Sequence, residues 1–188
     1  MKPDDDIAHL QERLAVLMAR QGVGAAFRRL VDAYERRVLY FILRFVDDPD
    51  QALDILQEVW LSVFRLLPRL EAIEAFRVWL YKIVHGKIAA FIRARRRVPA
   101  PIESCEDPPS ESGAADESAF ENAELVHRAL ADLSFDHREV LTLHFLEGMR
   151  LEEIAQALSC PLGTVKSRMY HAKRSLRDIV ERLSHGKP

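Results

Sequence analysis

Polar and cationic side chains gather in the segment 163–176, GTVKSRMYHAKRSL, between regularly spaced apolar ones. The apolar residues recur at intervals of four, three and four, which places them on one side of a helix: Val165, Met169, Ala172 and Leu176. The remaining side chains include eight that suit hydrogen bonds with base edges or phosphates: Thr164, Lys166, Ser167, Arg168, Tyr170, His171, Lys173 and Arg174. This pattern predicts a helix that packs by one face and binds nucleic acid by the other.

Charge alone does not separate this interpretation from an ordinary solvated helix, and the preceding residues favour the first. LEEIAQAL (151–158) predicts a helix of barely two turns, and a short turn follows it. Pro161 suits the first turn of the next helix, which we expect to run to about residue 183. A short apolar helix, a turn and a cationic helix predict a helix-turn-helix, whose second helix enters the major groove of DNA.

A second group of polar residues lies in DILQEVW (54–60). Asp54 and Glu58 are four residues apart, with Gln57 beside them, and the spacing assigns an apolar stripe to the other side of the helix: Leu53, Leu56, Trp60 and Val63. Like charges at this spacing destabilise a helix slightly. The two carboxylates would complement a basic partner surface, although charge alone favours ordinary solvation.

A third group lies in the basic segment Phe76–Arg97. It offers seven side chains that can bind phosphates: Lys82, His85, Lys87, Arg93, Arg95, Arg96 and Arg97. A cationic track of this kind, together with stacking side chains, suits single-stranded nucleic acid. Trp79 could supply such stacking, but its spacing from Phe76 and Ile83 favours a place in the core.

The elements that must position these groups are helices. Leu, Ala, Arg and Glu are abundant, Gly counts only 7 of 188 residues, and alternating β-type runs are missing, so we predict an all-α protein. Apolar periodicity predicts helices over these ranges: 7–19, 24–45, 51–67, 75–96, 122–133, 137–146, 151–158 and 161–183. Asp136 and Glu139 resemble a capping box that opens the sixth, and Gly148 follows its end.

The segment 98–124 separates two groups of helices. It carries eight carboxylates, no Lys or Arg, and four prolines, so we expect a flexible, extended linker of net charge −8. The flanking region 27–97 has net charge +5, although the whole chain has only −2. We therefore predict two small helical domains, 1–97 and 125–188, joined by the acidic linker 98–124.

Several functional classes find no support. The acidic start MKPDDD is unlike a secretory signal, and the apolar run Val38–Leu43 is too short to cross a bilayer, so we expect a cytoplasmic protein without membrane insertion. Cys105 and Cys160 stand alone, so we expect no metal site, and we expect no cofactor. Neither a P-loop nor HExxH is present, and no nucleophile motif is recognisable. We expect no catalytic residue and no enzyme.

The three groups together resemble bacterial RNA polymerase sigma factors of the sigma-70 family, extracytoplasmic-function (ECF) group. LEEIAQALSCPLGTVKSRMYHAKRSLR is similar to the family's C-terminal helix-turn-helix, DILQEVW to its D-x-x-Q-E-x-F/W segment, and FRVWLYKI to its F-x-x-W-L-Y-x-I segment. The resemblance implies that the eight residues at 164–174 bind the minus-35 promoter element. It implies that Asp54, Gln57 and Glu58 dock on the β′ subunit of core RNA polymerase, and that the cations of 76–97 bind and help to melt the minus-10 element.

The resemblance also implies partners and departs from the family pattern at three places. The implied partners are core RNA polymerase, through its β′ and β subunits, and promoter DNA; many relatives are also held by an anti-sigma factor. Gly86 stands where the family often has Asn, and Ser159 where helix-turn-helix turns often have Gly. Leu70–Ala72 stand where a loop often reads F-R-G; in relatives this loop holds a flipped minus-10 base. The alternative interpretation is a stand-alone helix-turn-helix regulator.

Overall fold

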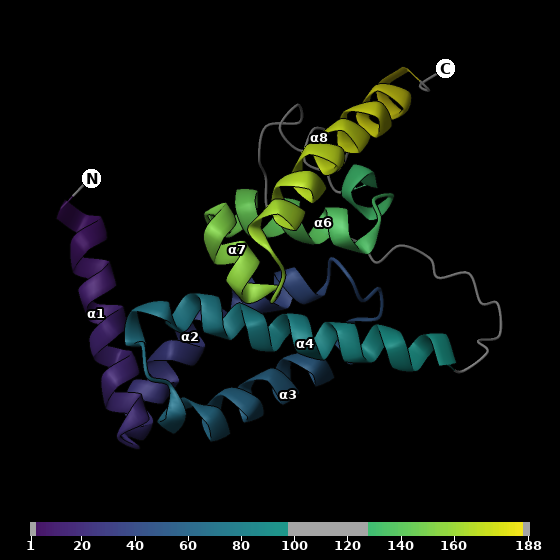
Figure 1. The fold of residues 1–188 in the computed structure, drawn as a ribbon. Helices are drawn as coiled ribbons and strands as arrows, with labels where there is room; N and C mark the ends of the chain where they lie inside the picture. The colour runs from purple at the N-terminus through teal and green to yellow at the C-terminus, as the bar shows by residue number, and fades with distance from the viewer. Residues whose placement is uncertain (1–2, 98–127, 186–188) are drawn as a thin grey trace, which may run out of the picture. The chain divides into compact units, whose positions relative to one another are not determined.

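The computed structural model describes residues 3–97 and 128–185, which form helices without a strand among them (Figure 1). The predicted all-α fold is confirmed. The described chain divides into two compact units, one made mainly of α1 to α4 and the other made mainly of the helices from residue 128 onward. The predicted linker 98–124 lies outside the described residues, so its character and the proposed domain boundaries stay predictions.

Unit 1 contains four long helices close to the predicted ranges. Their bounds are α1 Pro3–Arg20, α2 Gly24–Ile42, α3 Pro49–Leu66 and α4 Phe76–Arg97. Gly22 ends α1 in the left-handed conformation with φ of 88°, which glycine adopts without steric cost. Asp48 caps α3, because its Oδ1 accepts hydrogen bonds from the N–H groups of Asp50 at 2.9 Å and Gln51 at 3.3 Å.

The core of unit 1 forms where α2, α3 and α4 pack together. Each helix contributes fully or almost fully buried side chains: Leu30, Val38, Phe41 and Ile42 of α2, Leu56, Val59 and Val63 of α3, and Leu80, Val84 and Ile88 of α4. Rings join α2 to α4 edge to face, with centroids 5.3 Å apart for Phe41 and Tyr81. Trp79 is half-buried, so it lies at the margin of the predicted core rather than inside it.

Helix α1 is attached to α2 by a partly buried polar contact. The Tyr34 hydroxyl donates a hydrogen bond to Oε1 of Glu12. Burial raises the pKa of Tyr34 well above its usual value, and the bond to the Glu12 carboxylate adds to the shift. The Tyr34 ring also meets Phe76 edge to face at 5.6 Å, so the contact extends to the start of α4.

Unit 2 begins with a helical turn at 128–131, the described part of the helix predicted over 122–133. Its further elements are α6 Phe135–Leu141, the π-helical turn η3 Thr142–Leu146, α7 Leu151–Ala157 and α8 Leu162–His185. The predicted helix 137–146 therefore starts earlier and changes to π geometry in its second half. Gly148 follows it with φ of 65°, as its position after the helix suggested.

Two predicted helix-start signals in unit 2 are wrong in detail. The Asp136–Glu139 capping box does not form, since α6 begins at Phe135 after Ser134, which provides no side-chain cap. Asp136 instead lies in the first turn, and Glu139 is fully buried. Pro161 precedes α8 by one residue, and its carbonyl accepts hydrogen bonds from the N–H groups of Thr164 and Val165.

Candidate nucleic-acid and protein interfaces

The turn between α7 and α8 has a defined geometry. Ser159 has φ of 52°, a left-handed conformation that favours the glycine often found at this place in helix-turn-helix turns. The N–H of Cys160 donates to the carbonyl of Ala155 at 3.0 Å, which closes the end of α7 as in a Schellman motif. The direction in which α8 leaves α7 is therefore set by the backbone of this turn.

The predicted two faces of α8 are present. Val165, Met169 and Ala172 are buried, whereas Leu176 is only half-buried, and Ile179 continues the stripe. Six of the predicted DNA-binding residues are exposed: Lys166, Ser167, Tyr170, His171, Lys173 and Arg174. Thr164 and Arg168 are half-buried. One continuous polar surface thus runs along α8 opposite its core stripe.

Two of the cations on this surface have partners within unit 2. Nη2 of Arg168 lies 2.9 Å from Oδ2 of Asp136, which ties α8 to α6. Nζ of Lys173 lies 5.3 Å from the centroid of the Phe145 ring, a cation–π distance. Arg168 is therefore less available to a phosphate in this conformation than its position in the sequence suggests.

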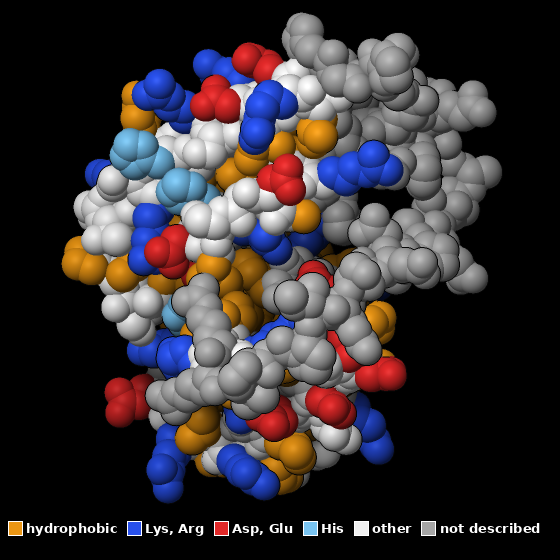
Figure 2. Space-filling model, turned by 90° about the vertical axis from the view of Figure 1, so that its right-hand side faces the viewer, with side chains coloured by type: hydrophobic (Ala, Val, Ile, Leu, Met, Phe, Trp, Pro, Cys, Tyr) orange, Lys and Arg blue, Asp and Glu red, His pale blue; other side chains and the backbone are white. Residues whose placement is uncertain are grey.

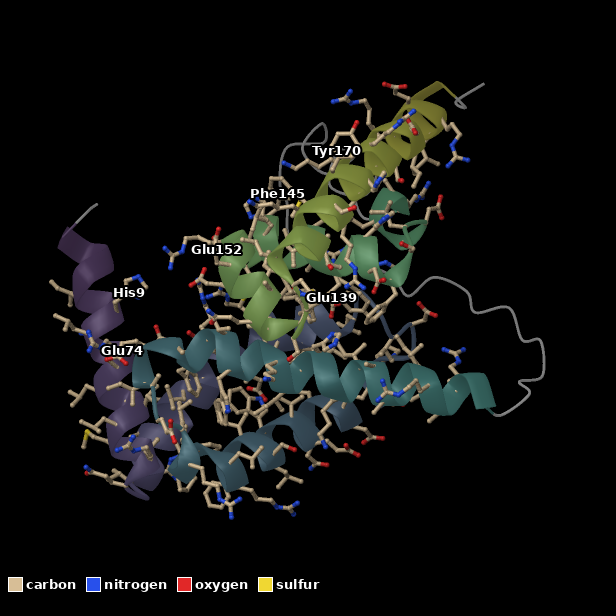
Figure 3. The ribbon with its side chains drawn as sticks, viewed as in Figure 1. His9, Glu74, Glu139, Phe145, Glu152 and Tyr170 are labelled. Atoms are coloured by element: carbon tan, nitrogen blue, oxygen red, sulfur yellow. The ribbon has the colours of Figure 1, made fainter. Side chains whose placement is uncertain are left out.

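The structure reveals an exposed apolar pair that the sequence analysis missed. Phe145 and Leu146, in the π-helical turn η3, are 61% and 55% exposed. Figure 3 shows Phe145 and Tyr170 projecting outward from neighbouring parts of unit 2. Periodicity could not place this pair, because the π turn shifts the register of the residues that follow α6.

Helix α3 presents Asp54, Gln57 and Glu58 on its exposed side, as predicted. The predicted apolar stripe is wrong at Leu53, which is 49% exposed, while Leu56, Trp60 and Val63 are buried. Leu53 lies outside the stripe because Ala52, Ile55 and Val59 also fill the inward side. Leu61 and Phe64 are exposed too, so the α3 face combines apolar and acidic groups.

Elsewhere on the molecule, apolar side chains likewise lie at the surface between charged ones (Figure 2).

The predicted cations of α4 do not share one side of the helix. Spacings of three and eight residues place Lys82, His85 and Arg93 on one side, within about a quarter turn. Lys87 points toward α3 instead, with its Nζ 3.0 Å from Oε2 of Glu58. Arg95 is exposed on another side. The side chains of Arg96 and Arg97, at the end of α4, are outside the described set, so their contribution stays a prediction.

A short helix, a left-handed turn and a helix with one buried and one cationic face define a helix-turn-helix DNA-binding protein. Comparison with known proteins refines this class. A family model of sigma-70 region 2 matches residues 30–98, and one of sigma-70 region 4 matches residues 123–176.

Two curated relatives match along most of the chain. The RNA polymerase sigma-H factor of Pseudomonas aeruginosa is 32% identical over 184 residues, which cover 92% of this chain and 95% of the relative. The ECF RNA polymerase sigma-E factor of Escherichia coli K12 is 31% identical over 185 residues, covering 93% and 96%. The chain belongs to the sigma-70 family of RNA polymerase sigma factors, in the ECF group.

Two solved structures show the same fold. CnrH, in complex with the cytosolic domain of CnrY, superposes with a TM-score of 0.68 at 21% identity, covering 91% of this chain and 97% of CnrH. The sigma factor RpoE from Bartonella quintana, in complex with the anti-sigma factor NepR, gives 0.66 at 24% identity, covering 82% and 96%.

Family membership settles the general function. The chain is an RNA polymerase sigma factor, a transcription initiation factor and not an enzyme. The interpretation as a stand-alone regulator is not favoured. Among the described residues, no cluster of His, Cys, Asp or Glu is suited to hold a metal ion. In the same part of the chain, every helix is too short or too polar to span a bilayer.

Proposed function

We propose that the exposed face of α8 reads the minus-35 element of the promoter. The observation that carries this proposal is the α7–turn–α8 geometry, in which the core stripe of α8 is buried and its polar face is exposed. Lys166, Ser167 and His171 lie in the first half of α8, where a recognition helix contacts base edges. Lys173 and Arg174 follow and suit phosphates. Thr164, Arg168 and Tyr170 complete the assigned set.

Helix α4 is proposed to bind the minus-10 element through its cations. Lys82, His85 and Arg93 share one side of the helix and form the main track, whereas Lys87, Arg95, Arg96 and Arg97 are retained as further contacts from the resemblance. Leu70–Ala72, within the segment 67–75 between α3 and α4, would hold the flipped minus-10 base, as the corresponding loop does in relatives. This assignment does not name the base.

The α3 face is proposed to dock on the β′ subunit of core RNA polymerase. Asp54, Gln57 and Glu58 provide negative and polar groups, and the exposed Leu53 and Leu61 provide apolar area beside them. A mixed surface of this kind combines the apolar contact and charge complementarity that protein interfaces use. The exposed Phe145–Leu146 pair of η3 is assigned to a second contact with core polymerase, through β.

Three further assignments complete the proposal. The chain works in the cytoplasm, with domains 1–97 and 125–188 joined by the acidic linker 98–124. An anti-sigma factor regulates it, which is supported by the two solved relatives: one is described in complex with an anti-sigma factor and the other with the cytosolic domain of CnrY. These parts of the proposal rest on sequence and comparison.

Run-off transcription tests the proposed function. The purified chain is added to core RNA polymerase on a library of genomic promoter fragments, with core enzyme alone as the control. We expect transcripts that start at defined sites and share two upstream sequence elements. A chain that binds core polymerase and yields no defined start would overturn the proposal.

A further inference from the structure

The segment 67–75 between α3 and α4 has little structure of its own. It consists of two single 3-10 turns, η1 Leu67–Arg69 and η2 Ile73–Ala75, joined by three residues of which the last two are exposed. Leu67 and Leu70 are its buried side chains. Short 3-10 turns have weaker hydrogen-bond geometry than α-helices, so other elements must hold such a segment in place.

Helix α1 supplies two side chains that hold it. Nη1 of Arg20 donates a hydrogen bond to the carbonyl of Leu70 at 2.9 Å. Nη2 of Arg13 lies 2.5 Å from Oε1 of Glu74, in an ion pair that spans 61 positions of the sequence. Figure 3 shows Glu74 alongside α1. The two contacts hold the segment at the residue that follows η1 and within η2.

Helix α1 is itself fixed to the body of unit 1. Val16 and Ala19 are buried, and Glu12 accepts the hydrogen bond from Tyr34 described above. Tyr34 in turn contacts Phe76, the first residue of α4. Because these contacts fix α1 against α2, its arginines can hold residues 67–75 in one geometry.

We propose that Arg13 and Arg20 are positioning residues that set the conformation of segment 67–75 and thereby its discrimination of the minus-10 base. The inference rests on the proposed function for its second half, because that segment is the assigned base-binding element. Arg13 and Arg20 themselves contact no DNA in this scheme. They act by restricting the segment before a base arrives, which lowers the entropic cost of binding the correct one.

Hydrogen exchange of the full-length chain tests the first half. Arg20→Gln removes the charged donor to Leu70, and we expect exchange in residues 67–75 to rise about fivefold to tenfold. Arg13→Glu should raise it about twofold to fivefold, because the ion pair with Glu74 is exposed. The double variant Arg13→Glu/Glu74→Arg should return it to the wild-type rate. Arg28→Glu, an exposed charge reversal on α2, is the matched control and should leave the segment unchanged.

Transcription on a set of promoters that differ at single minus-10 positions tests the second half. The wild-type chain must first transcribe the preferred promoter, which separates failure of the proposed function from failure of this inference. Arg20→Gln and Arg13→Glu should then lose about threefold to tenfold in selectivity between preferred and substituted promoters. Arg20→Lys and the charge-swapped double variant should recover it.

Two results would overturn the proposal. The first is unchanged exchange in residues 67–75 after both substitutions, which would show that α1 does not position the segment. The second is faster exchange without any change in base selectivity. It includes the case in which the charge-swapped double variant restores neither the exchange rate nor the selectivity. A merely structural role would lower activity on all promoters alike without altering their ratio.

Discussion

At the scale of single residues, Lys166 and His171 are exposed in the first half of α8 while the neighbouring Val165 and Met169 hold the core. Replacing either exposed residue by alanine should weaken binding to a minus-35 duplex by about 1–3 kcal/mol, because a base-edge contact is lost without disturbing the fold. Fluorescence anisotropy at fixed salt measures this.

The matched control for these variants is Arg182→Ala, an exposed cation near the end of α8. It should leave duplex affinity almost unchanged, and all three variants should bind core polymerase normally. Equal losses for Lys166→Ala and Arg182→Ala would mean that α8 attracts DNA by overall charge and reads no base.

Tyr34 gives a prediction about pH. Its raised pKa means that the folded chain retains the phenol proton at a pH where the unfolded chain, with a pKa of 10.0, has lost it. The stability that the buried, neutral Tyr34 and its bond to Glu12 contribute is therefore complete below pH 10 and decreases as the pH rises above it. At pH 8, Tyr34→Phe should lower the free energy of unfolding by about 1–2 kcal/mol.

Above pH 10 the difference between the wild type and Tyr34→Phe should narrow, by at most about 1.4 kcal/mol per pH unit. Urea unfolding of both chains at pH 8 and near pH 11 measures it. A difference that is equal at the two pH values would show that Tyr34 has no raised pKa in the folded chain.

At the scale of elements, the turn before α8 contains Ser159, a residue other than glycine that adopts a left-handed conformation. That conformation costs a non-glycine residue about 1–2 kcal/mol, which a glycine would avoid. Glycine also loses more conformational entropy on folding, which offsets about 0.5–1 kcal/mol of the stabilisation. Ser159→Gly should therefore stabilise unit 2 by about 0.5–1 kcal/mol, and Ser159→Val should destabilise it. Hydrogen exchange of the α7 and α8 amides reports both; stabilisation by valine would contradict the assignment.

The α3 face gives the second prediction for an element. Reversing both charges, Asp54→Lys with Glu58→Lys, should weaken binding to core polymerase about tenfold or more, because a basic partner would then meet like charges. Duplex minus-35 binding should remain. Competition with a labelled wild-type chain for core polymerase measures the loss.

Two controls separate docking from other effects of this double reversal. Asp32→Lys with Glu35→Lys makes the same charge change on the exposed side of α2. Lys87→Ala removes the partner of Glu58 without reversing the α3 face. Core affinity that is unchanged by the α3 reversal, or reduced equally by the α2 reversal, would disprove the docking assignment.

Most helices could be predicted because their apolar spacing and end signals are local. The ranges of α2, α3 and α4 follow from periodicity, and the end of α7 from the turn at Ser159. Leu53 was assigned to the wrong side because α3 has more apolar residues than its buried side holds, and spacing alone does not tell which of them are exposed. The capping box at Asp136 failed because α6 begins one residue earlier, at Phe135, which places Asp136 in its first turn.

The candidate sites were predictable as residue types and not as contacts. Exposure of Lys166, His171 and Asp54 follows from helical spacing. The pairs Lys87–Glu58 and Arg13–Glu74 span 29 and 61 positions, and only the packing of helices brings their members together. The exposed Phe145 depends on a π turn, for which the sequence offered no local signal.

At the scale of the whole molecule, the net charge is −2, although the chain contains basic regions that are proposed to bind promoter DNA, a polyanion. Promoter binding should therefore weaken steeply with salt, with a log–log slope near −0.9 for each phosphate contacted. Replacing Lys173 and Arg174 together by alanine should reduce the magnitude of that slope by about 1.8. A titration of duplex binding against salt measures it, and an unchanged slope would remove both residues from the phosphate contacts.

The ion pair between Lys87 and Glu58 has a consequence for the order of assembly. Its members are assigned to different macromolecules, Glu58 to the polymerase and Lys87 to the promoter. A polymerase surface that binds the Glu58 carboxylate leaves the Lys87 ammonium group available to a phosphate. By thermodynamic reciprocity, a phosphate that binds Lys87 favours polymerase binding at Glu58 by the same free energy. Binding to the polymerase would thus strengthen the binding of DNA to α4, by at most about 1 kcal/mol because the ion pair is exposed.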